Sequence, residues 1–233
     1  MIHLAFKHDF SDYVGAGRTE RAVVEAFGET LAGSDRPLLL ASGVAILAPG
    51  SVATESDAAP GGSDAPRGGS ERLALDYAAR GVRSVSLRFA PTVHGDRDGG
   101  FISALVDAAR ATGTSGYVGD GLNRWPAVHR LDAARMVRLA LEKAPAGCVV
   151  HAVAEEGIPT RDIADVIGRH LELPVTSIAP EDAASHFGWI GGFFSLDSPA
   201  SSALTRELLD WTPTHPGLIE DLEARYYFRA PSE

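Results

Sequence analysis

Cysteine is almost absent from this 233-residue chain, with Cys148 as its only occurrence. A lone cysteine excludes an intrachain disulfide and a cysteine-based metal cluster, and it favours a reducing cytoplasmic location. The sequence also lacks any apolar run near the roughly 18 residues of a membrane-spanning helix, so we expect no membrane partner. Basic residues are not in excess either, since the formal net charge is −10. A nucleic-acid partner, which requires a basic face, is therefore not expected.

Motifs of common cofactor and catalytic sites are missing as well. A dinucleotide-binding turn has G-x-G-x-x-G between a strand and a helix. Gly15 and Gly17 come nearest, but the third glycine is absent and a polar segment precedes them. Ser42 follows an apolar run, yet its surroundings are not the G-x-S-x-G elbow of a hydrolase. The histidine–aspartate pairs lack the spacing of a metal site, so no metal is expected; these pairs are His8–Asp9, His94–Asp96 and His129–Asp132.

The residues that are present indicate an α/β protein with a sizeable core. Hydrophobic residues make up 45% of the chain, and short apolar runs alternate with amphipathic stretches, as in a mostly parallel sheet with crossover helices. Asp132 is expected to cap a helix. The long loop 43–69, rich in Gly, Ala, Ser, Asp and Pro, is expected to be either an active-site segment or disordered. The expected strands are 2–6, 38–41, 82–89 and 149–153, and the clearest expected helices are 19–31, 70–79, 159–171 and 218–226.

Several segments in a fixed order are more specific than composition and periodicity. Each ends a predicted strand or precedes a predicted helix, and each combines small, hydroxyl or aromatic residues with glycine, proline or histidine. The segments are LLLAS (38–42), LRFAPTVHG (87–95), GDG (119–121), WPAVHRLD (125–132) and LLDWTP (208–213).

Together these segments resemble the extended and atypical short-chain dehydrogenase/reductase (SDR) superfamily, of the NAD-dependent epimerase/dehydratase type. The resemblance implies a partial Rossmann fold, a doubly wound parallel sheet without its N-terminal strands, and a small C-terminal mixed α/β substrate lobe. It assigns 1–115 to the remaining dinucleotide-binding domain and 116–233 to an interleaved substrate lobe with returning Rossmann elements. The implied activity is hydride transfer between NAD or NADP and an alcohol or ketone carbon of a small, sugar-like or steroid-like substrate.

The resemblance also carries site residues onto this sequence. Ser42 matches the catalytic hydroxyl that hydrogen-bonds the substrate oxygen, and Arg124 resembles an arginine that faces the substrate. His129 and Asp132 match an H-x-x-D that orders the loop before the lobe. The implied cofactor-binding residues are Leu4, Ala5, Phe6, Phe89, Ala90 and Pro91.

Two positions depart from the family pattern. Arg67 stands where the family has its catalytic tyrosine, and Glu71 stands where it has the lysine four residues later. An arginine stays protonated near neutral pH and cannot replace the tyrosine as an acid or base. Asp9 or Glu20 could hold the place of the family's asparagine, although the residues alone favour an exposed acid at Glu20. Tyr77, the nearest phenol, is expected in the core.

The opening segment MIHLAF resembles a strand from the middle of the dinucleotide-binding sheet. We therefore expect it to form a sheet edge, the glycine-rich turn to be lacking, and NAD(P) binding by this chain to be weak. An SDR-fold binding or regulatory protein without catalysis, and an N-terminally truncated gene product, stay open beside the enzyme. The expected partner is a small-molecule substrate, and a homodimer stays open. Four aromatic residues of the lobe form either a pocket or its core: Phe187, Trp189, Phe193 and Phe194.

Overall fold

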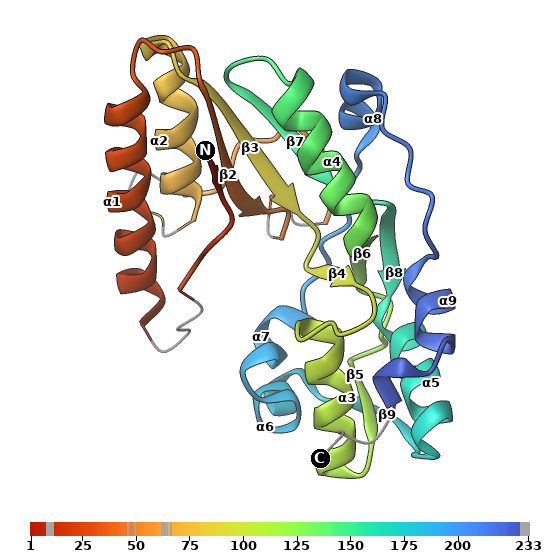
Figure 1. Cartoon of the computed structure of the whole chain (residues 1–233). Helices are drawn as coiled ribbons and strands as arrows, with labels where there is room; N and C mark the ends of the chain where they lie inside the picture. Colours follow the sequence, from red (N-terminus) through yellow and green to blue (C-terminus); the bar gives the residue numbers. More distant parts are fainter. Residues whose placement is uncertain (8–11, 46, 49, 62–64, 66, 229–233) are drawn as a thin grey trace.

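The structure is a computed structural model that describes residues 1–7, 12–45, 47–48, 50–61, 65 and 67–228. It consists of a sheet with helices on both faces and a smaller lobe below it (Figure 1). No helix in these ranges is long and apolar enough to cross a membrane. The α/β class and the mostly parallel sheet expected from the sequence are confirmed.

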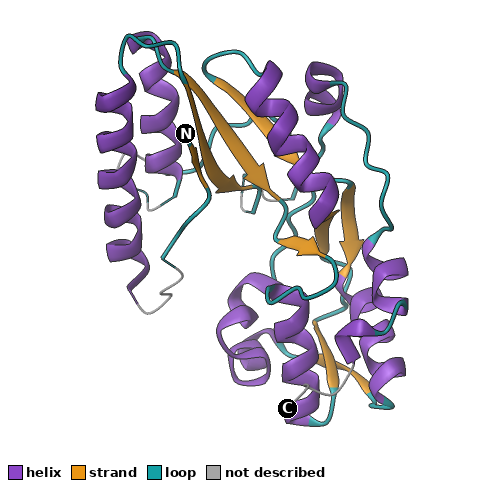
Figure 2. Ribbon diagram, viewed as in Figure 1, coloured by secondary structure: helices purple, strands orange, loops and turns teal. Residues whose placement is uncertain are grey.

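The main sheet has four parallel strands in the order β1-β2-β3-β7. These strands are β1 (Ile2–His3), β2 (Pro37–Gly43), β3 (Arg83–Phe89) and β7 (Cys148–Ala152). Figure 2 shows helices on both sides of them, which explains the continuous apolar run 38–41 of β2. β3 instead alternates apolar and polar residues, and its polar residues Ser84, Ser86 and Arg88 are buried. β1 lies at an edge of the sheet, as expected. It is shorter than expected, and Ile2 and Leu4 are exposed, so the prediction of a buried opening strand is wrong.

Alternate residues of β2 point to opposite faces of the sheet. Leu38 and Leu40 pack toward α1 (Tyr13–Leu31) and α2 (Gly68–Asp76), whereas Leu39 joins the core beneath α4 (Arg130–Lys143). The 3₁₀ turn Tyr77–Arg80 follows α2, and the Tyr77 ring lies so close to Gly28 that a Cβ there would clash with it. Tyr77 is buried and donates a hydrogen bond to Glu29, so its expected core position is confirmed.

The lobe has its own core around Trp125, Phe187 and Phe194. A mixed three-stranded sheet and a parallel two-stranded sheet lie between the main sheet and the end of the lobe. Their strands are β4 (Thr92–His94), β6 (Arg124–His129) and β8 (Glu155–Pro159), then β5 (Ser115–Val118) and β9 (Val175–Ile178). The lobe helices are α3 (Phe101–Thr112), α5 (Thr160–Leu171), α6 (Ala183–Phe187), α7 (Gly191–Phe194) and α9 (Leu218–Glu223), with 3₁₀ turns at Pro180–Asp182, Gly188–Ile190 and Tyr226–Phe228.

The chain passes repeatedly between the two cores. After α3 and β5 in the lobe, α4 and β7 return to the main sheet, and α8 (Ala203–Leu209) packs beside them through Leu209. The lobe and the sheet are therefore built from interleaved segments of the chain. The division expected at residues 115 and 116 stays a prediction.

Helix α4 begins differently from expectation. Its N-cap is His129, whose ring accepts a hydrogen bond from the Leu131 backbone N–H at 3.3 Å. Asp132, expected to be the cap, lies buried in the first turn. The prediction was wrong because the Asp132 carboxylate accepts hydrogen bonds from the segment before α9 instead of from its own helix.

Candidate functional site

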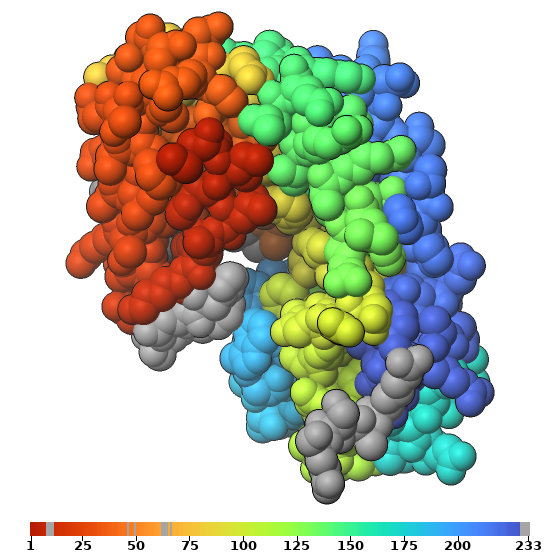
Figure 3. Space-filling view, in the orientation of Figure 1, coloured from red at the N-terminus to blue at the C-terminus, as the bar shows by residue number. Residues whose placement is uncertain are grey.

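A cleft of about 560 Å³ opens between the carboxyl ends of β2 and β3 and the lobe. Figure 3 shows the hollow between the N-terminal segment in red and the lobe in blue and yellow. Ligands of open parallel α/β sheets bind at this edge of the sheet. The described residues lining it are Leu4, Phe6, Tyr13, Ala41–Gly43, Ala45, Leu47, Ala59, Pro60, Ala65, Arg67, Gly68, Phe89–Pro91, Val93, Phe101, Trp125, Phe193, Leu196 and Ser198.

Most of the site residues expected from the sequence meet in this cleft. Ser42 lies near the end of β2, and Phe89 ends β3 beside it, since Gly43 pairs with Phe89. Ala90 and Pro91 follow directly after β3 and also line the cleft. Leu4 and Phe6 line the cleft from the segment after β1. Ala5 is exposed and is not among the lining residues. The roles assigned to these residues stay predictions.

Arg67 places a positive charge on the wall of the cleft. Its guanidinium donates a hydrogen bond to the Ala41 carbonyl at 3.2 Å, and it lies 4.2 Å from the centre of the Phe6 ring. The same group lies 3.5 Å from the carboxylate of Glu20, and a quarter of the Arg67 side chain is exposed. The residue in the tyrosine position is therefore a charged group held in place from three sides.

Glu20 is buried behind Arg67, and the expectation that it is an exposed acid is wrong. Helix α1 begins at Tyr13, six residues before the predicted start, so Glu20 falls on the face that packs against the sheet, one turn from Ala16 and Val24. Burial raises the pKa of Glu20 to about 7, against the opposing effects of Arg67 and of a hydrogen bond with Ser70. Among the described residues, its Oε1 has no hydrogen-bond partner.

Glu71 points away from the cleft. It is buried and forms an ion pair with Arg88 of β3, with Nη2–Oε1 at 2.5 Å and Nε–Oε1 at 3.0 Å. Arg88 also donates to the Asp57 carbonyl at 2.8 Å and lies against His151. The residue in the lysine position therefore fastens α2 and the loop 53–59 to the sheet.

Tyr13 is a cleft residue that the sequence analysis did not identify. It lies in the first turn of α1 and lines the cleft on the side of Arg67. Burial raises the pKa of this phenol, with Arg67 acting in the opposite direction. No motif marks Tyr13 as a cleft residue. The one signal for the start of α1 is Asp12, a preferred N-cap residue whose carboxylate accepts a hydrogen bond from the Gly15 backbone N–H at 2.9 Å. Asp9 lies outside the described residues.

Arg124 lies beside the cleft rather than on its wall. It forms a two-point ion pair with Asp197, with Nη2–Oδ2 at 2.9 Å and Nε–Oδ1 at 3.0 Å, and its neighbour Trp125 lines the cleft. Because the Arg124 guanidinium is already paired with Asp197 at two points, these contacts indicate a structural role for Arg124. Its expected contact with substrate stays a prediction.

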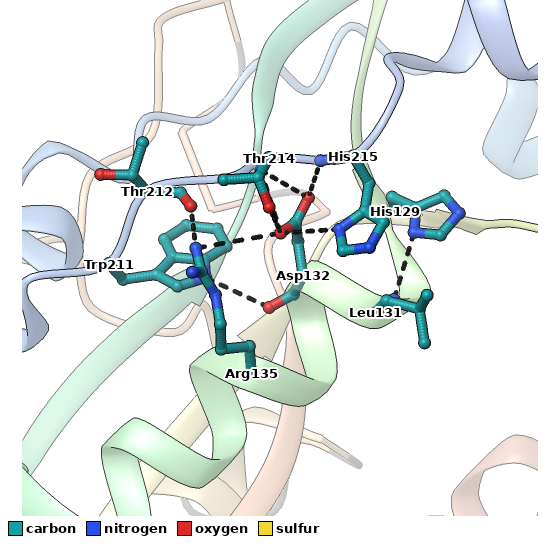
Figure 4. Close-up of polar contacts among 8 residues, drawn as sticks. All are labelled: His129, Leu131, Asp132, Arg135, Trp211, Thr212, Thr214 and His215. Carbon is teal, nitrogen blue, oxygen red and sulfur yellow. Dashed lines mark hydrogen bonds and ion pairs between the residues drawn. The ribbon is translucent and has the colours of Figure 1, made fainter.

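The H-x-x-D segment orders the loop before α9, in keeping with its expected structural role. The Asp132 carboxylate accepts the backbone N–H groups of Thr214 at 3.0 Å and His215 at 2.9 Å, and it lies 3.1 Å from the His215 ring (Figure 4). His129 stacks on His215 with ring centres 4.7 Å apart. Although burial opposes it, these hydrogen bonds hold the pKa of Asp132 below its ordinary value. No group of three or more histidine, cysteine or acidic side chains in the described ranges is placed to hold a metal ion.

Aromatic side chains form the lobe side of the cleft. Phe101 packs edge-on against Trp125 at 5.2 Å and against Phe193 at 6.0 Å. The half-exposed Trp189 lies 5.3 Å from Phe101. Of the four aromatic residues considered in the sequence, Phe187 and Phe194 are lobe core, and Phe193 lines the cleft.

The cleft fits one end of a nicotinamide dinucleotide. The small and apolar residues Phe89–Pro91, together with the Ser42 hydroxyl, suit a flat nicotinamide ring. The described residues do not supply a glycine-rich cradle for the pyrophosphate, because Gly15 and Gly17 lie inside the first turns of α1. The weak NAD(P) binding expected of this chain stays a prediction, as does the assignment of the nicotinamide end to these residues.

Comparisons with known proteins identify sequence relatives of this chain and solved structures with a similar fold. No family model matches the sequence. The chain is 47% identical over 229 residues to the uncharacterized protein C2A9.02 of Schizosaccharomyces pombe, covering 98% of this chain and 77% of that protein. It is 45% identical over 226 residues to the uncharacterized protein YLL056C of Saccharomyces cerevisiae, covering 97% and 76%.

Solved structures of NAD-dependent epimerases and dehydratases share the fold. DesIV, a dTDP-glucose 4,6-dehydratase from Streptomyces venezuelae with NAD and TYD bound, matches with a TM-score of 0.72 at 18% identity over 97% of this chain and 72% of that one. UDP-glucuronic acid 4-epimerase from Bacillus cereus with UDP-glucuronic acid and NAD matches with a TM-score of 0.67 at 20% identity, covering 95% and 69%. These likenesses confirm the Rossmann-like fold that the sequence motifs predict.

Proposed function

The chain belongs to the family of these two yeast proteins, and from its fold and cleft we propose that it is an NAD(P)-dependent oxidoreductase of the epimerase/dehydratase type. Its substrate in this proposal is a small alcohol or ketone bound in the cleft at the carboxyl end of the sheet. The neighbours with this fold carry NAD and act on sugar nucleotides, which supports the cofactor class and the reaction type.

One observation carries the proposal. Residues from β2, β3 and the start of α2 converge on the same cleft, although they are far apart in sequence: Ser42, Phe89–Pro91 and Arg67. The carboxyl ends of parallel strands are where open α/β sheets hold their ligands, and the lobe closes the opposite side. Ser42 and Phe89–Pro91 therefore line the same cleft.

The chain's own residues have distinct roles in this proposal. The Ser42 hydroxyl hydrogen-bonds the reacting oxygen of the substrate and orients it. Arg67 presents a fixed positive charge that cannot move a proton near neutral pH. The apolar walls exclude water from the reacting carbon. Phe89–Pro91 would hold the nicotinamide, which when bound supplies the hydride acceptor or donor.

Turnover by the full chain tests the proposal. Purified protein is given NADH or NADPH at high concentration with a panel of aldehydes, ketones and UDP- or dTDP-sugars, and nicotinamide absorbance and sugar products are followed. Ser42→Ala should lower kcat by about 10²-fold or more, the typical cost of losing one oxyanion donor. Ser185→Ala, exposed on α6, is the matched control and should leave kcat unchanged. Turnover that Ser42→Ala does not lower contradicts the assigned role.

A binding protein without catalysis is the second candidate function. The observation in its favour is the pair of replacements: Arg67 stands where the resembling family has its tyrosine, and Glu71 is held by Arg88. If the panel binds in the cleft but neither cofactor is turned over, this candidate replaces the enzyme.

A further inference from the structure

Most of the described residues that line the cleft are apolar, which does not suit a ligand with many hydroxyl groups. Among its described lining residues, only Ser42, Tyr13 and Ser198 carry a hydroxyl, and only Arg67 carries a charge. A sugar nucleotide brings many hydroxyls and a diphosphate, and burying such groups without partners is costly. The volume of about 560 Å³ is within the range of small-molecule sites. The lining thus favours a ligand with a flat apolar body and few polar groups.

The positive charge is at one place on this apolar wall. Arg67 donates to the carbonyl of Ala41, the residue before Ser42, so the guanidinium and the Ser42 end of β2 are neighbours. Lobe aromatics line the opposite side through Phe101, Trp125 and Phe193. A guanidinium pairs with a carboxylate in a planar, two-point geometry.

We propose that the cleft binds an aromatic or alicyclic oxo or hydroxy acid, with its carboxylate on Arg67 and its ring against the lobe aromatics. The reacting oxygen then lies at Ser42. This inference rests on the proposed function and narrows its substrate class, because an apolar acid, rather than a sugar nucleotide, satisfies both the single cation and the aromatic wall.

Glu20 lets the guanidinium accept a second anion. Its carboxylate is the partner of Arg67 on the buried side, 3.5 Å away, and its pKa is raised to about 7 by burial. A carboxylate ligand arriving at Arg67 repels a charged Glu20, so binding favours proton uptake by Glu20. Among the described residues, His3 of β1 and Tyr13 of α1 also respond to Arg67. Burial, the larger effect, and then Arg67 lower the pKa of His3. Burial raises the pKa of Tyr13, and Arg67 acts in the opposite direction.

Binding of a matched pair of probes tests this without any turnover. Naphthoate and the uncharged naphthamide have the same ring and differ at the group that would meet Arg67. Titration calorimetry with the full chain should give at least about tenfold tighter binding of naphthoate, the range of a charge-assisted hydrogen bond. UDP-glucuronic acid should bind more weakly than naphthoate.

Variants test whether Arg67 causes the difference in affinity between naphthoate and naphthamide. Arg67→Met should abolish the preference for naphthoate and leave naphthamide unchanged, and Arg67→Lys should retain part of it. Arg72→Met, exposed on the same helix, should leave both affinities as they are. Where Arg67→Met does not fold, wild type in buffers of different ionisation enthalpy decides: naphthoate binding should take up protons near neutral pH, and Glu20→Gln should remove that uptake.

Three results would overturn the inference: equal affinity for naphthamide, an Arg67→Met variant that keeps the preference, or tighter binding of UDP-glucuronic acid. These outcomes are separate from failure of the proposed function. A chain that binds naphthoate through Arg67 yet turns over neither cofactor keeps the ligand assignment and loses the oxidoreductase.

Discussion

The guanidinium of Arg67 lies 3.5 Å from the carboxylate of Glu20, with Arg67 on the wall of the cleft and Glu20 buried behind it. The resembling family has a tyrosine and a lysine at positions 67 and 71 of this chain. Here Arg67 alone of the pair lines the cleft, and the residue at the lysine position, Glu71, instead pairs with Arg88 of the sheet. The cleft therefore has a fixed charge in place of a proton donor.

Glu20 should make the protein less stable as pH rises. Its folded pKa of about 7 is above that of an unfolded glutamate, so its contribution is fully present below the unfolded pKa and is lost as pH rises through about 7. Between about pH 5 and about pH 8, the wild type should lose on the order of 2–3 kcal/mol of unfolding free energy. Glu20→Gln should remove most of that decline, as measured by urea denaturation at both pH values.

The control is Glu25→Gln, an exposed position on the same helix. This variant should show the same decline as wild type. A Glu20→Gln curve parallel to that of wild type across this pH range would show that Glu20 is not titrating there.

Breaking the buried Arg88–Glu71 pair should destabilise the fold strongly. Both side chains are 2% exposed, and removal of one partner leaves an uncompensated buried charge. Glu71→Ala should cost roughly 3–5 kcal/mol, whereas Glu142→Gln in an exposed pair with Arg138 should cost less than about 1 kcal/mol. Equal urea midpoints for the two variants would contradict this.

The same pair prevents a simple restoration of the family's dyad. Arg67→Tyr with Glu71→Lys would set an ammonium against the buried Arg88 guanidinium. We expect this double variant to unfold at lower urea concentration than Arg67→Tyr alone, with no gain of turnover. A stable double variant with new activity would show that the position of Glu71 can reach the cleft.

Asp132 should support stability at neutral pH and less so in acid. Its folded pKa is held low, so its contribution is present above the unfolded pKa and is lost as pH falls through the folded value. Asp132→Asn leaves the N–H groups of Thr214 and His215 without a charged acceptor and should cost about 2 kcal/mol near neutral pH. The deficit relative to wild type should shrink at about pH 3; a deficit that is constant with pH would count against an ionised Asp132.

Cys148 should react slowly with thiol reagents in the native protein. It begins β7 and is half-buried, and burial raises the pKa of its thiol to about 11. Because the thiolate is the reactive form, labelling by a disulfide reagent should be about a hundredfold or more slower than in urea. Comparable rates in both conditions would contradict the raised pKa.

The sequence predicts the sheet and its motifs well because they depend on local patterns. Apolar runs indicate β2 and β7, and an alternating pattern indicates β3. The fixed order of the segments that resemble the family predicts that Ser42 and Phe89–Pro91 lie together. These positions follow from strand ends, which in a parallel sheet meet at one edge.

Long-range pairing is the part that the sequence did not reveal. Glu20 reads as an exposed helix acid because its partner Arg67 is 47 positions later and because the apolar periodicity indicates the helix only from residue 19, although Asp12 caps it before Tyr13. Asp132 reads as a helix cap because the groups that donate to its carboxylate, the backbone N–H groups of Thr214 and His215, lie far away in the sequence and reach it only in the folded chain. Charged residues at functional or bridging positions commonly break local rules in this way.

A crystal structure of the full chain with reduced nicotinamide mononucleotide tests the central claim most directly. This compound contains only the nicotinamide end of the cofactor, which is the part that the described residues fit. We predict its ring against Phe89–Pro91 with Ser42 facing the same space. A ring bound outside this cleft, or an empty cleft at a saturating concentration, would contradict the assignment of the carboxyl edge of the sheet as the site.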